Sequence, residues 1–326
     1  MPSLTRAVFL VATALAAISC GSDVTIVPVK DDPVPDSTGT TRTLLTDAPF
    51  PYDRVARVDL YVVSVSGSLS PDTSATAGGN FMTLATPNRR INVLALNGGL
   101  TDELGRATLS TGAITAVRMV IDTDSSSITL KDGRVLTGNS TPGIHWQSSA
   151  GRPTLNALIQ EQIQVPSTGG VAVIDFDVGQ AFIPPQEINP TSTDSGFVFS
   201  PVLRAADSTR TGSIAGVVRA HNANGAPVAD ASLRLYLGKY GTPGNPNGTP
   251  ENSWSTLATA KTDANGAFKF SYVTRSAWWA GSPSHANETY IVAVDPPSTS
   301  SLVRTLVPNV VVTAGQETTL NTVILP

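Results

Sequence analysis

Residues 115–122 read TAVRMVID, and this stretch indicates the fold class. Thr115, Val117, Met119 and Ile121 fall on every second position, which is the period of a β-strand with one buried face. The same alternation recurs in residues 172–178, 214–218, 233–237, 268–272 and 290–294. Residues 155–162 fit either a helical period or a strand. The sequence therefore predicts an all-β fold.

Turn signals between these segments indicate two β-sandwich domains. Lys131-Asp132-Gly133 and Asp263-Ala264-Asn265-Gly266 each separate two apolar runs, as hairpin turns do. Short strands joined by regular turns are typical of immunoglobulin-like and transthyretin-like sandwiches. We expect one sandwich over residues 42–207 and a second over residues 208–326.

The first nineteen residues, 1–19, have the pattern of an export signal. Arg6 supplies a basic start, and residues 7–18 form an apolar run shorter than the ~20 residues of a transmembrane helix. The run ends in Ala17-Ile18-Ser19-Cys20-Gly21-Ser22. This stretch resembles the lipobox of bacterial lipoproteins, in which the cysteine is lipidated and becomes the first mature residue, although Ala17 stands where leucine is usual.

Cys20 is the only cysteine in the chain. A lone thiol in an exported protein needs an explanation, and acylation removes the thiol. The alternative is an ordinary secretory signal with an incidental cysteine. Residues 20–41 hold three prolines and no sustained periodicity, so we expect a flexible tether after the lipidated residue. The expected location is the bacterial cell envelope, lipid-anchored. Gly21 and Ser22 lack the aspartate that retains some lipoproteins at the inner membrane, which favours the outer one.

The charge balance excludes one class of partner. The formal net charge is −4, and removal of residues 1–19 takes away Arg6 alone and makes it −5. The sequence shows no basic run or arginine-rich stripe, so we expect no nucleic-acid partner. Sparse charge with abundant Ser, Thr, Gly and Pro suits an exported β-protein rich in turns.

Several motifs, taken in order, resemble a known but uncharacterised family. Their residues are 45–49 (LTDAP), 58–62 (VDLYV) with Gly67, 91–98 (INVLALNG), 117–122 (VRMVID), 165–167 (VPS), 174–178 (IDFDV) and 200–204 (SPVLR). Residues 42–206 thereby resemble the domain-of-unknown-function family 4382. The resemblance implies an envelope lipoprotein and a β-fold, and it implies no activity.

The remainder of the chain resembles a different family. The segments that match are residues 212–218 (GSIAGVV), 226–231 (APVADA) and 262–268 (TDANGAF). Residues 212–326 thereby resemble a carboxypeptidase regulatory-like domain, a transthyretin-like sandwich that usually accompanies another module and performs no catalysis. Residues 238–253 and 276–287 depart from the compact form of that domain, so individual function could reside in them.

Motifs for catalysis and metal binding are scarce. His145, His221 and His285 lie far apart in sequence, and no HExxH or Gly-x-Ser-x-Gly motif occurs. We therefore expect no enzyme and no cofactor. Asp175 and Asp177 would share one strand face, which makes them weak candidates for Ca²⁺. The simpler interpretation is a solvent-facing edge with arginines such as Arg118 or Arg204 nearby.

Aromatic residues in the long loops are the best candidates for a binding site. Trp278 and Trp279 lie in a stretch of small polar residues, and Trp254 and Tyr240 border the other loop. Exposed aromatic rings stack on sugars or anchor a protein partner. Packing into the core is the alternative for each of them. The same two interpretations apply to the dipeptide His145-Trp146.

These observations favour a non-catalytic envelope lipoprotein that displays two β-sandwiches and binds a glycan, a peptide or a surface protein. A structural spacer or assembly component is the first alternative. An uncharacterised hydrolase or a Ca²⁺-dependent binding protein is the second. The expected partners are the membrane, through the lipid anchor, and a glycan or protein ligand.

Overall fold

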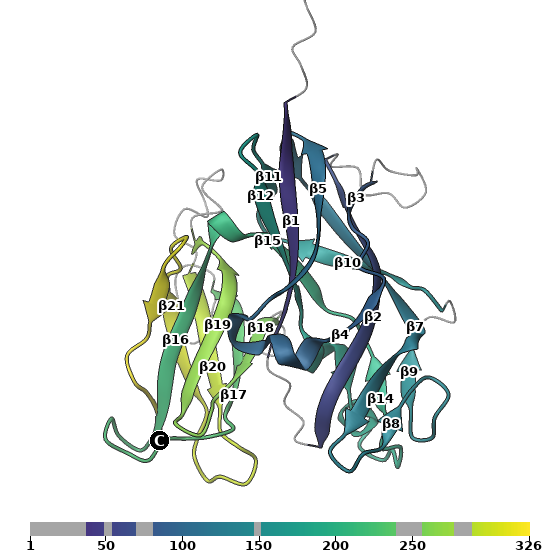
Figure 1. The fold of residues 1–326 in the computed structure, drawn as a ribbon. Helices are drawn as coiled ribbons and strands as arrows, with labels where there is room; N and C mark the ends of the chain where they lie inside the picture. The colour runs from purple at the N-terminus through teal and green to yellow at the C-terminus, as the bar shows by residue number, and fades with distance from the viewer. Residues whose placement is uncertain (1–36, 49–53, 70–80, 147–150, 239–255, 277–288) are drawn as a thin grey trace, which may run out of the picture. The chain divides into compact units, whose positions relative to one another are not determined.

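The computed structural model describes residues 37–326 apart from 49–53, 70–80, 147–150, 239–255 and 277–288 (Figure 1). Ser37–Pro326 form one compact unit. Almost all of its regular structure is strand, and the prediction of an all-β sandwich fold is confirmed. We refer to residues 38–207 as the first module and to residues 211–326 as the second module.

The first module is built on one large sheet. The path of this sheet runs β3 (Phe81–Ala85), β2 (Val55–Ser68), β7 (Ala116–Leu130), β10 (Thr154–Ile159), β15 (Leu203–Asp207), β12 (Gly170–Phe176), β1 (Thr38–Asp47) and β5 (Asp102–Ser110). Two further strands pair with it, β4 (Arg89–Asn92) with β2 and β8 (Val135–Leu136) with β7. The sheet curls so that its end strands, β5 and β3, come into contact. A Cβ atom on Gly105 of β5 would lie 3.0 Å from the Cβ atom of Ala85 in β3.

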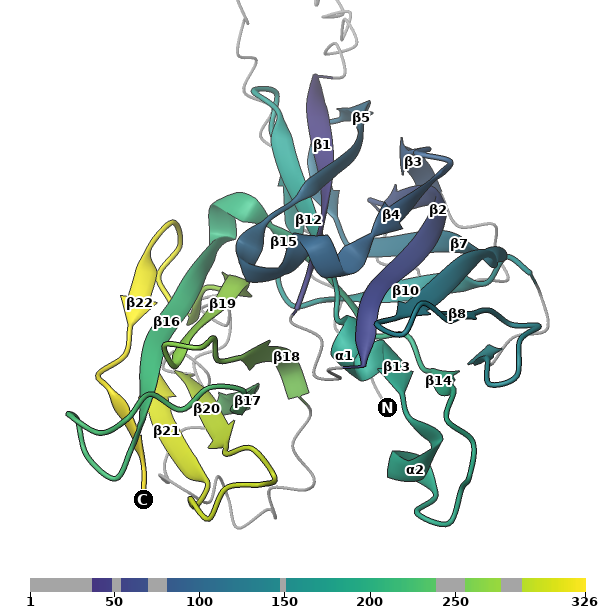
Figure 2. The same ribbon diagram turned by 60° about the horizontal axis from the view of Figure 1, so that its bottom comes forward.

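Smaller elements complete the first module. They are η2 (Val93–Gly99), β6 (Gly112–Ile114), β9 (Ile144–Trp146), β11 (Ile163–Val165), α1 (Val178–Ala181), β13 (Phe182–Ile183), α2 (Pro185–Ile188) and β14 (Phe197–Phe199). Figure 2 shows α1, β13 and α2 following one another near β14. Ring packing is part of the module's core, with Trp146 4.7 Å and Phe182 5.0 Å from Phe199 between centroids.

The second module has two four-stranded sheets. One contains β19 (Ala267–Thr274), β16 (Thr211–Ala220), β22 (Glu317–Thr319) and β23 (Val323–Leu325). The other contains β18 (Thr256–Lys261), β17 (Ser232–Gly238), β20 (Thr289–Asp295) and β21 (Thr305–Val310). A core separate from that of the first module lies among their buried side chains, including Ile214, Leu235 and Phe270. The turn η3 (Ser208–Arg210) links the modules.

Two sequence-based predictions need correction at element boundaries, one helix was not predicted, and one ambiguous stretch is resolved. The predicted tether ends too late, because Thr38–Thr41 already lie in β1 and Thr41 is fully buried between β5 and β12. Val178 does not continue β12 but begins α1, because Asp177 accepts a hydrogen bond from the backbone of Gln180 and caps that helix. The helix η2 was missed. The ambiguous stretch 155–162 is mainly the strand β10.

Candidate functional site

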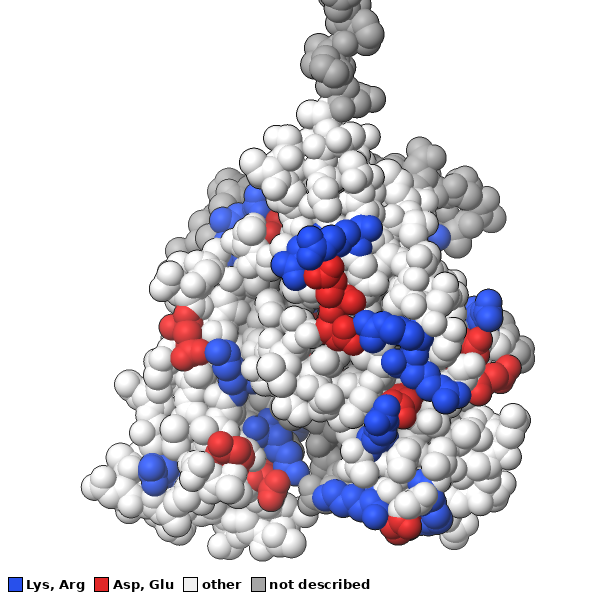
Figure 3. All heavy atoms as spheres, in the orientation of Figure 1, with Lys and Arg blue, Asp and Glu red and all other residues white. Residues whose placement is uncertain are grey.

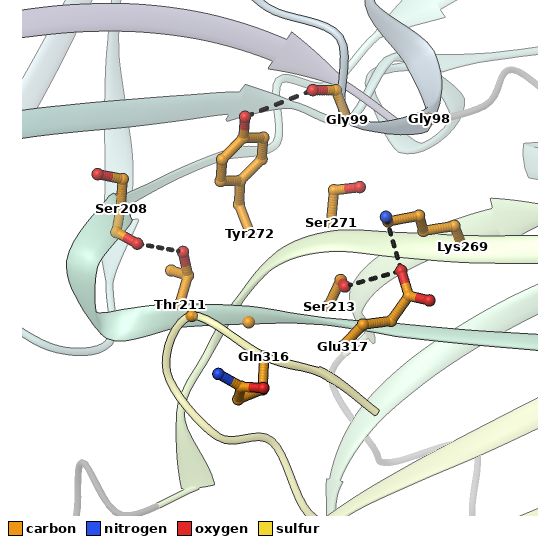
Figure 4. A pocket seen from close by; sticks show the side chains of 12 residues that line it. Gly98, Gly99, Ser208, Thr211, Ser213, Lys269, Ser271, Tyr272, Gln316 and Glu317 are labelled. Atoms are coloured by element: carbon orange, nitrogen blue, oxygen red, sulfur yellow. Dashed lines mark hydrogen bonds and ion pairs between the residues drawn. The ribbon is translucent and has the colours of Figure 1, made fainter. Parts of the chain in front are cut away.

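A polar groove lies where η2 meets the β16–β19–β22 face of the second module (Figure 4). Its main hollow measures about 380 Å³ and is lined by Gly98, Gly99, Ser208, Thr211, Gly212, Ser213, Lys269, Ser271, Tyr272, Gly315, Gln316 and Glu317. A second hollow of about 490 Å³ shares Gly98, Lys269 and Glu317 with it and extends to Asn97 and Phe268. We call the two together the polar groove.

A β-bulge in β19 shapes the wall of the groove. Gly212 pairs with Val273 and Ile214 with Phe270, so Ser271 and Tyr272 together stand opposite one residue of β16. Tyr272 has a φ of 52°, which is rare for a bulky side chain. Backbone strain of this kind is concentrated at functional sites in proteins.

The bulge brings β19 against the end of η2. The Tyr272 hydroxyl donates to the carbonyl of Gly99 over 3.4 Å, as Figure 4 shows. Gly99 has a φ of 91°, and a Cβ atom there would lie 2.6 Å from Ser271 Oγ, so glycine is required at this approach. The Ser271 hydroxyl is buried and has no hydrogen-bond partner among the described residues.

One ion pair stands where the two hollows meet. Lys269 Nζ lies 2.7 Å from Glu317 Oε2, and Ser213 Oγ donates to the same oxygen over 3.3 Å. The hydrogen bond from Lys269 holds the pKa of Glu317 below its usual value. Both side chains are close to half exposed, at 43% and 46%. The pair is neutral in sum, yet it offers a donor and an acceptor side by side to an incoming hydroxyl.

A separate buried cluster joins three of the family motifs. Asp47 of the LTDAP motif accepts a hydrogen bond from the Val178 backbone of the IDFDV motif over 3.0 Å. Asp175 of the same motif forms an ion pair with Arg204 of the SPVLR motif. Asp177 accepts from Gln180 and from the Thr259 hydroxyl of β18 at 3.0 and 3.1 Å. The cluster thus fastens β1, β12, β15 and the second module to one another.

The predicted solvent-facing edge at Asp175 and Asp177 is wrong. Their exposed fractions are 8% and 1%, and both have the protein partners just described. Arg204 does pair with Asp175, whereas the Arg118 guanidinium lies 3.7 Å from the Phe81 ring centroid instead. Within the described part of the chain, no three His, Cys, Asp or Glu residues are grouped so that they could hold a metal ion.

Five predicted site residues lie outside the described residues. They are the lipidation candidate Cys20 and the loop aromatics Tyr240, Trp254, Trp278 and Trp279.

In the dipeptide His145-Trp146, the tryptophan packs in the core and the histidine is exposed. Trp146 packs against Phe182 and Phe199, so its ring belongs to the core. His145 is exposed, and its Nε2 lies 2.5 Å from Asp194.

The groove residues were missed from sequence for a physical reason. The alternation of Phe268, Phe270 and Tyr272 predicts three rings on one face, but only the first two are buried, at 5% and 2% exposure. The bulge shifts the register by one residue and turns Tyr272 away from that face. Lys269 lies between Phe268 and Phe270 in the alternation, and the alternation itself could have flagged it as outward-facing.

The described residues thus define an all-β protein of two modules with a polar groove at their junction. Residues 38–198 match the model of a family described as a domain of unknown function, DUF4382. The expected resemblance is confirmed over these residues. The resemblance of residues 212–326 to a carboxypeptidase regulatory-like domain stays a prediction, as does the division into domains at 207 and 208.

Similar solved structures include a 9R-lipoxygenase from Cyanothece, the TIE protein of Bacillus anthracis and the minor pilin GBS52 of Streptococcus agalactiae. Identities are 17%, 7% and 11%, and TM-scores are 0.21, 0.20 and 0.22. The matches cover 36%, 87% and 87% of this chain. The chain spans 17% of the lipoxygenase, 34% of the TIE protein and 95% of the pilin. No curated protein matches the chain.

Proposed function

We propose that this protein is a non-catalytic, lipid-anchored component of a bacterial cell envelope, and that the polar groove binds a glycan. Cys20 is the proposed anchor, because the preceding residues resemble a lipobox and the chain holds no second thiol. In the described part of the chain, no helix is both long and apolar enough to cross a membrane. Two or more acyl chains would supply stable attachment.

The lining of the groove carries the glycan proposal. Hydroxyls, an amide and a paired lysine and glutamate supply most of the polar atoms, and the charges cancel. Such a surface matches a ligand that offers many hydroxyls and no strong net charge of its own. Ser271, whose hydroxyl has no partner among the described residues, adds a further polar residue to the lining. Tyr272 adds a ring to the same wall.

Binding of oligosaccharides tests this proposal. A glycan array followed by calorimetric titration would be run with the wild type, with Lys269→Ala and with Lys131→Ala. Lys131 is an exposed lysine in the turn after β7, outside the groove, and serves as the matched control. We expect Lys269→Ala to weaken binding about tenfold or more and Lys131→Ala to bind as the wild type does.

The outcomes separate the three functional classes. Equal binding by wild type and Lys269→Ala would remove the groove from consideration. The absence of any glycan ligand would favour a structural spacer, and cleavage of a bound glycan would favour a hydrolase. For the anchor, metabolic labelling with palmitate should mark the wild type and leave Cys20→Ala unlabelled; labelling of both would refute lipidation at Cys20.

A further inference from the structure

A ribbon of arginines crosses the face of the first module over β1, β5 and β4 (Figure 3). We define the arginine ribbon as Arg42 on β1, Arg89 and Arg90 on β4, and Arg106 on β5, together with Asp102 and Glu103 of β5. These residues come from three separate stretches of the chain, and none of the stretches is a long basic run. The fold brings them together, because Arg42 and Arg106 are cross-strand partners and the Arg89 side chain of β4 reaches Asp102 of β5.

Five of the six residues of the ribbon form one hydrogen-bonded network, and Arg90 lies beside it. Arg42 and Arg106 are direct cross-strand partners, and both donate to the same carboxylate, that of Glu103, at 2.7 to 3.2 Å. The two guanidinium groups lower the pKa of Glu103 to about 2.

The network continues from β5 to β4. Arg89 donates twice to Asp102, at 2.7 and 2.8 Å, and once to the carbonyl of Glu103. Arg90 donates to the carbonyl of Ser125 over 2.7 Å.

The ribbon holds more positive than negative charge. Arg42, Arg89 and Arg106 share the two carboxylates, whereas Arg90 donates only to a backbone carbonyl. The six residues of the ribbon sum to a charge of +2 on a chain whose formal net charge is −4. The neighbouring pairs Arg57–Asp59 and Arg152–Asp122 add one charge of each sign, and the exposed Asp124 next to Ser125 lowers the local excess to +1. Like charges placed directly opposite across a strand pair are unfavourable, as for Arg42 and Arg106. The Glu103 carboxylate screens the two guanidinium groups from each other, and a bound anion would add to that screening.

We propose that the arginine ribbon is a binding surface for an anionic polysaccharide that carries carboxylate groups. Guanidinium groups bind carboxylates through two parallel hydrogen bonds, and those of Arg42, Arg89 and Arg106 are 43% to 58% exposed. The choice of a polysaccharide rests on the glycan function proposed above. Asp102 follows the groove residue Gly99 by three positions, which limits their separation to ~11 Å. The ribbon therefore begins close to the groove along the chain.

Binding of polygalacturonate to the full-length protein tests the proposal, with uncharged dextran as the neutral polymer. The double variant Arg90→Ala/Arg106→Ala leaves the ribbon neutral while keeping the Arg42–Glu103 and Arg89–Asp102 pairs. The control is Lys131→Ala/Arg134→Ala, which removes the same charge from an exposed turn outside the ribbon. We expect the ribbon variant to bind about tenfold more weakly and the control to bind like the wild type.

Two further measurements sharpen the test. Glu103→Gln should bind more tightly than the wild type, because it removes a carboxylate that competes for Arg42 and Arg106; this gain cannot arise from misfolding. Raising NaCl from about 0.05 to about 0.5 M should abolish binding of polygalacturonate. Equal losses in ribbon and control variants, or equal binding of dextran, would overturn the proposal. So would binding of phosphatidylglycerol vesicles or DNA through the ribbon without any binding of polygalacturonate.

Polygalacturonate binding by the ribbon variant and by the groove variant Lys269→Ala tests the two surfaces separately. Loss of polygalacturonate binding in the ribbon variant but not in Lys269→Ala would support the ribbon and count against the groove. The reverse pattern would refute the ribbon and leave the proposed function intact.

Discussion

The first module contains a buried carboxyl group that has no basic partner among the described residues. Asp47 is 5% exposed, its Oδ1 accepts from Val178, and its Oδ2 has no partner within the described structure. Burial raises its pKa well above the usual value, and the nearby charges of Asp175 and Asp177 add to the effect. The family motif therefore places an acid where neutrality is favoured.

The first prediction concerns the pH dependence of stability. Because the pKa of Asp47 is raised in the folded state, its contribution is fully present below the unfolded-state pKa and is lost as pH rises toward the folded-state pKa. Asp47→Asn keeps the acceptor for Val178 and cannot ionise. We expect this variant to be more stable than the wild type by at least ~1 kcal/mol at pH 7 and nearly equal to it at pH 4. Urea unfolding at both pH values measures the difference; a destabilised variant at pH 7 would contradict it.

For single residues, the sequence predicted the apolar core side chains better than the environment of the acidic side chains. Alternation identified Val117, Met119 and Ile121 as core residues, and all three are buried to 1% exposure or less. It could not show that Asp175 and Asp177 are buried with partners, since those partners come from β15 and β18. Pairing between distant segments is the information that a local pattern lacks.

Turns and bulges set the register of the elements that form the groove. Asp263 accepts hydrogen bonds from the backbones of Asn265 and Ala267, each at 2.8 Å, which closes the predicted turn before β19. That turn was predictable from its Asn-Gly dipeptide. The bulge at Ser271 and Tyr272 was not, because nothing in its own residues departs from strand-forming composition.

Two glycine-to-alanine variants separate the free-energy cost of backbone strain from the cost of a steric clash. Gly266 and Gly315 both have positive φ, of 75° and 70°. A Cβ atom on Gly266 would meet the Val218 carbonyl at 2.4 Å, whereas on Gly315 it would meet nothing within 4 Å. We expect Gly315→Ala to cost about 1 kcal/mol from backbone strain alone, and Gly266→Ala to cost about 3 kcal/mol or more. Denaturant midpoints of the two variants give the answer, and equal losses would contradict it.

The two modules have separate cores but are joined by polar contacts. Glu161, which follows β10, is 13% exposed and accepts hydrogen bonds from Arg275 at 2.6 and 3.1 Å as well as from Arg210. The hydrogen bonds of Thr259 to Asp177 and of Tyr272 to Gly99 lie in other parts of the same junction. The sequence predicted two sandwiches and gave no sign of how they would be held.

The third prediction concerns this junction. Glu161→Gln leaves two arginines without their shared carboxylate and should lower stability by about 2 kcal/mol. We expect calorimetry to show one unfolding transition for the wild type and two for the variant, since the cores then unfold independently. Asp132→Asn breaks an exposed pair with Arg134 and should cost less than about 1 kcal/mol. Identical melting curves for the two variants would show that Glu161 does not couple the modules.

Hydrogen–deuterium exchange in the presence of an array-selected oligosaccharide shows whether a glycan binds in the polar groove. We expect slower amide exchange in β19 around Ser271 and Tyr272 and in the segment from Gly315 to Glu317, with Lys269→Ala abolishing the protection. Protection confined to residues 239–255 or 277–288, or no protection anywhere, would contradict it.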